Sequence, residues 1–205
     1  MVDRNRENTG ESAPVGKLNL RTLEGQLLIA SPQMEDPRFR RAVILLLHYD
    51  DDGAMGIILN QRLPEGAGAH WEVLGDSIEI GDHRAYFGGP MPGSITVLHD
   101  VQSDRSHTPQ GRIYVLQKHE QLDKLLRVLD KNESVQFFVG HAGWASGQLE
   151  SEIADGSWLS IPASPDFVFN HDQNDMWMSA MREAGLSFYR EVLGIEEFPA
   201  DASLN

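Results

Sequence analysis

Short apolar runs, each bounded by glycine, proline or acidic residues, occupy much of the chain between residues 25 and 116. Such runs are typical of buried strands, because they are too short for stable helices and rich in Val, Ile and Leu. The strongest pair, residues 42–49 and 54–60, flanks an acidic loop with a glycine and predicts a β-hairpin. Further strands are expected at residues 25–30, 84–87, 94–99, 112–116, 135–139 and 158–161.

Helical spacing dominates the second half of the chain. Residues 119–131 predict a helix with one continuously buried face, formed by Leu122, Leu125, Leu126 and Leu129. Residues 147–154 predict a second helix, with Ser146 as its N-cap. Residues 177–184 predict a third helix that ends at Gly185.

Strands in the first half and helices in the second predict an α+β fold, not a regular alternation of strand and helix. Asp36 and the proline after it predict a single helical turn through Phe39. Residues 1–20 lack aromatic side chains and carry charges of both signs, so we expect a disordered arm. Residues 21–195 are expected to form one domain, followed by an acidic tail over residues 196–205.

The charge of the chain argues against polyanionic partners. Its 31 acidic and 17 basic side chains give a formal net charge of −14, which repels nucleic acids and anionic lipids unless a basic patch offsets it. The densest basic stretch, residues 38–41, follows Glu35 and Asp36. The chain has no cysteine, and no apolar run approaches the roughly 20 residues that span a bilayer. We therefore expect a cytoplasmic protein without direct nucleic-acid or membrane binding.

Several loops resemble catalytic or ion-binding motifs only in part. The turn at residues 88–90 follows a predicted strand but lacks the GxxxxGK[ST] and GxGxxG spacings of phosphate loops. The loop at residues 50–53 lacks the glutamate that completes a calcium loop, and Ser146 misses the GxSxG spacing by one residue. Glu150 and Glu152 lie two positions apart, so they do not share a helical face as an acid–base pair would.

Three of the eight histidines, His48, His99 and His141, lie near predicted strand ends. They could converge in space with Asn60 or Glu150 and hold a metal. No HExxH motif and no histidine pair at i, i+4 supports such a set. An enzyme or metalloprotein with a histidine-containing pocket is therefore the alternative hypothesis, and the main expectation is no catalytic residue, metal or cofactor.

The most unusual segment runs from His141 through Gly143 and Trp144 into the helix predicted at residues 147–154. Trp158 follows that helix, so tryptophans bracket it on both sides. Large aromatic side chains in this arrangement could line a ligand groove or seal the edge of the core.

In content and order, several segments resemble the AlgH/YqgE family of bacterial proteins. The resemblance extends over roughly residues 25–190, and it is specific as an ordered set although each segment alone is short. The segments are residues 28–32, 36–39, 53–60, 87–90, 98–99, 140–144, 147–150, 158–159, 167–169 and 175–177.

This resemblance implies a compact α+β domain with a strongly curved or barrel-like mixed β-sheet and flanking helices. It implies no reaction, because the family is functionally uncharacterised and only a transcription-regulator label is attached to some members. The sequence departs from the family pattern at His141, where relatives tend to carry tyrosine.

We expect a non-enzymatic binding or regulatory module that contacts another protein or a small ligand. The predicted surface combines the glycine turn with the segment from His141 to Glu152, because the family-like strings concentrate there and no catalytic constellation is visible. Its candidate residues are Asn60, Gly88, Gly89, Pro90, His141, Gly143, Trp144, Gln148 and Glu150.

Overall fold

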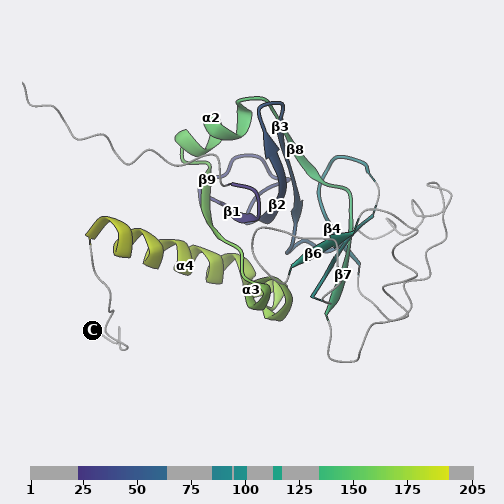
Figure 1. The fold of residues 1–205 in the computed structure, drawn as a ribbon. Coiled ribbons are helices and arrows are strands. Elements are labelled where there is room, and N and C mark those ends of the chain that lie inside the picture. Colours follow the sequence, from purple (N-terminus) through teal and green to yellow (C-terminus); the bar gives the residue numbers. More distant parts are fainter. Residues whose placement is uncertain (1–22, 64–84, 94, 101–112, 117–133, 194–205) are drawn as a thin grey trace, which may run out of the picture.

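The structure, a computed structural model, describes residues 23–63, 85–93, 95–100, 113–116 and 134–193. In these residues the strands form two open sheets, and three helices pack around them (Figure 1). The α+β class expected from the order of strands and helices is confirmed. No helix of the described residues is both long enough and apolar enough to cross a membrane.

The first sheet has five antiparallel strands in the order β8-β3-β2-β1-β9. Its strands are β1 (Gln26–Ala30), β2 (Val43–Asp50), β3 (Gly53–Ile58), β8 (Ala142–Ala145) and β9 (Trp158–Pro162). The predicted hairpin is confirmed, because β2 and β3 pair across the acidic loop with Asp50 opposite Gly53. Strand β8 was not predicted, since a four-residue strand with a glycine carries little signal of its own.

The second sheet has four strands in the order β4-β7-β5-β6. Its strands are β4 (Ala85–Phe87), β5 (Thr96–His99), β6 (Tyr114–Leu116) and β7 (Val135–Val139). Strand β7 lies between β4 and β5, parallel to β4 and antiparallel to β5. Strands β4 and β5 are consecutive in the sequence but are not neighbours in the sheet.

The barrel-like or strongly curved sheet expected from the family resemblance is wrong. Neither sheet of the described residues is closed: β8 and β9 form separate edges of the first sheet, and β4 and β6 form separate edges of the second. The two sheets meet where the chain leaves β3, because Ile58 donates a backbone hydrogen bond to Gly88 at 2.8 Å and Phe87 donates one to Gln61 at 3.0 Å.

Three helices follow: α2 (Gln148–Ala154), α3 (Pro165–Asn170) and α4 (Gln173–Leu193). Helix α2 is confirmed, but Ser146 does not cap it, because the N-cap is Gly147 and the Ser146 hydroxyl donates to the carbonyl of Asp51 at 2.6 Å. Helix α4 continues past Gly185, so the predicted end there is wrong. A glycine costs a helix only about 1 kcal/mol, which the buried face of α4 offsets.

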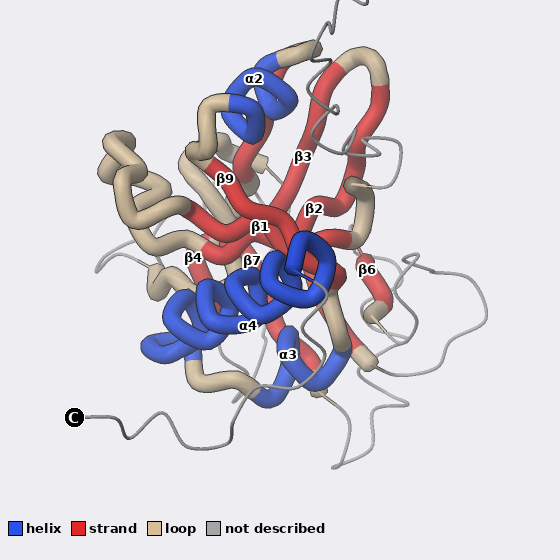
Figure 2. Tube along the Cα trace, turned by 90° about the vertical axis from the view of Figure 1, so that its left-hand side faces the viewer, coloured by secondary structure: helices blue, strands red, loops and turns tan. Residues whose placement is uncertain are grey.

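Strand β1, the first half of β2 and the end of β3 are buried on both faces. Side chains alternate along them, so Leu27 and Leu45 join the core beneath α3 and α4, whereas Leu28 and Ile44 join the core beneath α2. Figure 2 shows α4 and α3 in front of the strands, with α2 apart from them. The cavity described below lies on the α2 side. The predicted helix at 119–131, the arm and the tail lie outside the described residues.

Candidate functional site

A cavity of about 490 Å³ opens on the α2 side of the first sheet. Its walls come from the loop between β1 and β2, from Pro90 and Met91, from β8 and α2, and from the turn at residues 155–157. This volume falls within the roughly 300–1,000 Å³ of small-ligand pockets. Segments that are distant in the sequence therefore meet in a space of suitable size for a ligand.

The charged residues of the wall are mostly acidic. Four of the residues that line the cavity carry carboxylates: Glu35, Asp36, Glu152 and Asp155. Among these lining residues, Arg38 alone has a basic side chain. The guanidinium of Arg38 is paired with Asp36, with Nη2 lying 2.6 Å from Oδ2. The lining thus has an excess of negative charge, as does the whole chain.

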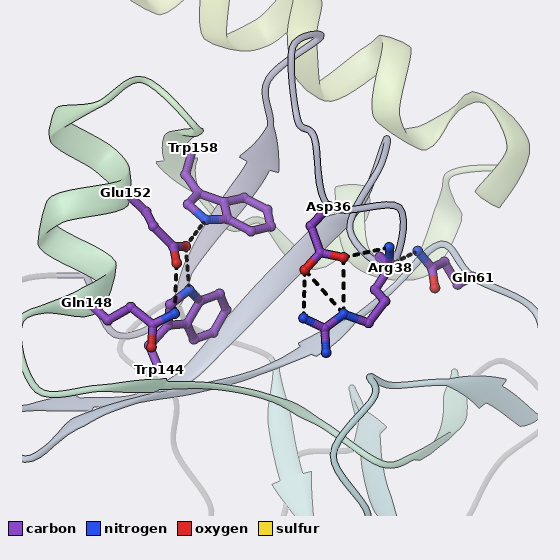
Figure 3. A network of polar contacts seen from close by, with 7 residues as sticks. All are labelled: Asp36, Arg38, Gln61, Trp144, Gln148, Glu152 and Trp158. Atoms are coloured by element: carbon purple, nitrogen blue, oxygen red, sulfur yellow. Dashed lines mark hydrogen bonds and ion pairs between the residues drawn. The ribbon is translucent and has the colours of Figure 1, made fainter.

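Glu152 is the centre of a hydrogen-bond network in this wall (Figure 3). Its Oε2 accepts from Nε1 of Trp144 at 2.9 Å and from Nε1 of Trp158 at 2.7 Å. Its Oε1 accepts from Nε2 of Gln148 at 2.8 Å. Three uncharged donors therefore hold the carboxylate in one position.

The network joins the two edges of the first sheet. Trp144 lies on β8 and Trp158 on β9, which are opposite edges, and α2 follows β8 and leads to β9. The two indole rings meet with centroids 5.9 Å apart and planes at 79°. Both tryptophans are almost fully buried, so each needs an acceptor for its N–H group, and Glu152 supplies it.

Phe39 adds a third ring to this wall. Its centroid lies 6.5 Å from that of Trp144, with the planes at 22°, and 5.8 Å from that of Trp158, with the planes at 70°. The ring is half-buried and comes from the loop between β1 and β2. The guanidinium of Arg38 lies 5.6 Å from the Phe39 centroid, within the range of a cation–π contact.

The turn that carries Phe39 is built by Asp36, and the turn predicted over residues 36–39 is confirmed. The carbonyl of Asp36 accepts from the Phe39 N–H at 3.1 Å, and its Oδ1 accepts from the Arg38 backbone N–H at 3.0 Å. Hydrogen bonds from the Arg38 side chain hold the pKa of the Asp36 carboxyl below its ordinary value, because they favour the charged form.

Asn60 holds the end of the same loop. Its Oδ1 accepts from the Val43 N–H at 2.9 Å, and its Nδ2 donates to the carbonyl of Arg41 at 2.8 Å. Arg41 has a φ of 56°, a conformation that residues with a Cβ rarely adopt, and the bond from Asn60 supports it. Asn60 does not line the cavity, so the structure gives it a role in shaping the loop.

The predicted glycine turn and tryptophan segment do lie together. Met91 and His141 exchange two backbone hydrogen bonds, at 2.9 and 3.0 Å, directly beside the turn. A Cβ on Gly89 would lie 2.2 Å from the carbonyl carbon of His141, and one on Gly88 would lie 2.4 Å from the oxygen of Gly140. These glycines permit the close approach of two chain segments and bring Pro90 into the cavity wall.

Glu150 faces away from this cavity. Its Oε1 accepts a hydrogen bond from the hydroxyl of Tyr49 at 2.6 Å, next to the β2–β3 hairpin. Burial and this hydrogen bond raise the pKa of Tyr49 to about 12. The prediction that Glu150 and Glu152 point in different directions is confirmed, because their carboxylates bind different partners.

The three candidate histidines lie in separate surroundings. His48 is exposed and its Nε2 lies 2.8 Å from Asp50, His99 is buried with its ring stacked on Tyr114, and His141 pairs with Met91 through the backbone. Within the described ranges, no three or more His, Asp or Glu side chains are grouped so that they could hold a metal ion. The metal-binding form of the alternative hypothesis therefore has no support among the described residues.

The predicted residues thus divide into three groups. Four of them line the cavity: Pro90, Gly143, Trp144 and Gln148. Gly88, Gly89 and His141 support its wall from behind, whereas Asn60 shapes the loop and Glu150 binds Tyr49. The predicted segment reached Glu152, but the candidate residues did not include it, and Phe39 was not predicted as a member of the site. The position of Glu152 four residues after Gln148, on the same helical face, was a signal for it.

The family model described as AlgH-like, DUF179, matches residues 27–189 of this chain. The chain belongs to the AlgH-like family. A UPF0301 protein of Myxococcus xanthus is 35% identical over 179 residues, which cover 85% of this chain and 98% of that protein. A UPF0301 protein of Chlorobaculum tepidum is 35% identical over 166 residues, covering 78% of this chain and 86% of that protein.

Two solved structures are similar to this AlgH-like chain. The solution structure of the AlgH protein from Pseudomonas aeruginosa superposes with a TM-score of 0.63 and 26% identity, covering 93% of this chain and 99% of that one. A crystal structure of a protein from Corynebacterium diphtheriae gives a TM-score of 0.61 and 26% identity, covering 78% and 85%. The names of these four proteins state no activity, so the cavity is the starting point for the function of this AlgH-like chain.

Proposed function

We propose that this AlgH-like chain is a non-enzymatic binding module, and that the cavity between the β1–β2 loop and α2 is its ligand site. The observation that carries the proposal is the Glu152 carboxylate, which is fixed in the cavity wall by Trp144, Trp158 and Gln148. A charged group held in one position by its neighbours suits recognition, because little ordering entropy is lost when a ligand binds to it.

The neighbours of Glu152 support binding over catalysis. General acid–base catalysis needs a group that exchanges protons near the working pH. The three groups bonded to Glu152 are two indoles and one amide, and none of them titrates in that range. The carboxylate therefore has no proton relay through these partners.

A regulatory role would follow from the composition of the walls. A ligand in the cavity would contact the β1–β2 loop and α2 at once, so occupancy would change the surface that these two segments present. The partner in this proposal is a small ligand or a protein segment that inserts a side chain. The net charge of −14 favours this mode over direct contact with DNA, and the acidic, cysteine-free composition is consistent with a cytoplasmic module.

A fragment screen read by the indole N–H signals of ¹⁵N-labelled protein tests the proposal. We expect fragments that shift the signals of Trp144 and Trp158 but leave that of Trp177, whose N–H donates to the carbonyl of Ala30. The variant Met91→Tyr should block these shifts by filling the cavity mouth, since Met91 is 45% exposed and lines it. Met178→Tyr, at an exposed position on α4, is the matched control. Fragment shifts that persist unchanged in Met91→Tyr would count against this site.

A further inference from the structure

We infer that the group received by this cavity is an ammonium group that donates a hydrogen bond to Oε1 of Glu152. The ammonium belongs to a small amine or to a lysine side chain of a protein partner. This inference rests on the proposed function, since it names the ligand chemistry of the same site.

The number of acceptor positions on Glu152 supports a single new donor. A carboxylate offers about four lone-pair positions, two on each oxygen. The indoles of Trp144 and Trp158 occupy both positions on Oε2, and Gln148 occupies one on Oε1. These three bonds do not use the second lone-pair position on Oε1. A single acceptor position suits an ammonium, because each of its N–H groups donates one hydrogen bond.

A guanidinium fits this arrangement less well. It binds carboxylates best through two parallel hydrogen bonds to two oxygens, and Oε2 of Glu152 is already saturated. The lining carboxylate that does bind a guanidinium in this way, Asp36, is occupied by Arg38 of the same chain. The open acceptor therefore selects the ammonium.

The charge of the lining favours a cation of either kind. Four carboxylates face one guanidinium in the wall, and the two ion pairs formed by described residues, Asp36–Arg38 and His48–Asp50, do not include Glu152. Burying a carboxylate without an opposite charge is unfavourable, so a cationic ligand that supplies it gains affinity.

The aromatic part of the wall adds a second attraction. Phe39, Trp144 and Trp158 all line the cavity, with their centroids between 5.8 and 6.5 Å from one another. Aromatic rings attract ammonium groups electrostatically and also bury the adjoining methylene groups. The contact of Arg38 with Phe39 shows that one of these rings already accepts a cation.

Titration of full-length ¹⁵N-labelled protein with n-butylammonium tests the inference. We expect saturable shifts of the Trp144 and Trp158 indole signals, because both donate to Glu152. 1-Butanol has the same alkyl chain without the charge. In n-butylguanidinium the ammonium is replaced by a planar group that donates two parallel hydrogen bonds. We expect both to bind at least about tenfold more weakly. Equal affinity for 1-butanol, or tighter binding of n-butylguanidinium, would overturn the inference.

Two variants with opposite expected effects sharpen this test. Glu152→Gln removes the negative charge and should lower the affinity for n-butylammonium at least about tenfold. Gln148→Leu removes the donor on Oε1, frees a second acceptor position and should strengthen binding about threefold. Glu183→Gln removes an exposed carboxylate on α4, outside the cavity, and its affinity for n-butylammonium should stay within about threefold of that of the unmodified protein. Because Gln148 is exposed, Gln148→Leu remains informative even if Glu152→Gln fails to fold, and weaker binding in Gln148→Leu contradicts the inference.

The two sources of the ammonium are separated by a second ligand. The blocked tripeptide acetyl-Ala-Lys-Ala-amide presents a lysine side chain on peptide backbone, and a higher affinity than that of n-butylammonium assigns the site to a protein partner. The reverse order assigns it to a small amine. If neutral fragments bind in the cavity and neither amine does, the ammonium inference fails and the binding module stands. If nothing shifts the two indole signals, both proposals fail.

Discussion

Nε1 of Trp158 lies 2.7 Å from Oε2 of Glu152, which precedes it by six residues in the chain. The same oxygen accepts from Trp144, so one carboxylate satisfies two buried indoles from opposite edges of the first sheet. Glu152 therefore has two roles that mutations can separate: it stabilises the fold through the indoles and it places charge in the cavity wall.

Glu152→Ala should destabilise the protein by about 2–4 kcal/mol, because two buried N–H groups lose their acceptor. Urea unfolding followed by tryptophan fluorescence measures the change. Asp155→Ala, at an exposed position next to the same helix end, should stay within about 0.5 kcal/mol. A cost for Glu152→Ala no larger than that of Asp155→Ala would show that the indole bonds are not formed in solution.

Gly89→Ala should destabilise the folded protein far more than Gly147→Ala does, although both glycines have positive φ. A Cβ on Gly89 would meet the backbone of His141 at 2.2 Å, whereas one on Gly147 would meet no atom within 4 Å. We expect more than about 3 kcal/mol for Gly89→Ala and about 1–2 kcal/mol for Gly147→Ala. Thermal unfolding followed by circular dichroism provides the comparison, and similar melting temperatures would refute the close packing of the turn.

Asn60→Ala should loosen the loop between β1 and β2. It removes the acceptor of the Val43 N–H, and we expect a loss of about 1–3 kcal/mol together with faster hydrogen exchange at that amide. Gln61→Ala removes a bond to the exposed carbonyl of Arg38, which water can replace, so it should cost less than about 1 kcal/mol. Unchanged exchange at Val43 in Asn60→Ala would contradict this role of Asn60.

Tyr49 should make stability fall at alkaline pH. Its pKa is raised to about 12 in the folded protein from an ordinary value of 10.0, so the unfolded chain releases the proton first. This contribution is complete below pH 10 and is lost as the pH rises towards 12. Urea unfolding across this range should show a steeper loss for the unmodified protein than for Tyr49→Phe. Parallel pH curves for the two proteins would exclude the raised pKa.

Local patterns were sufficient where a single segment decides its own structure. The acidic loop between two apolar runs predicted β2 and β3, and aspartate before proline predicted the turn that carries Phe39. The predicted end of α4 at Gly185 was wrong because one glycine costs a helix interior only about 1 kcal/mol, and residues 186–193, which continue the helix, contain no proline.

The site was predicted in part for the same reason. Trp144 and Gln148 stood out because they lie in one unusual segment, and both line the cavity. Phe39 comes from a loop about one hundred positions away in sequence, and the short strand β8 that carries Trp144 exists through its pairing with β3. Neither the contact of Phe39 with Trp144 nor the pairing of β8 with β3 can be predicted from the spacing of neighbouring residues.

The sequence by itself determined the α+β class, most strands and the acidic character of the surface, because these depend on short-range periodicity and on composition. Only the tertiary structure decided that β7 lies between β4 and β5, that the sheets stay open, and that Glu152 meets both tryptophans. The physical reason is that strand order and the convergence of side chains depend on which distant segments exclude water together, and that free energy belongs to no single stretch of the chain.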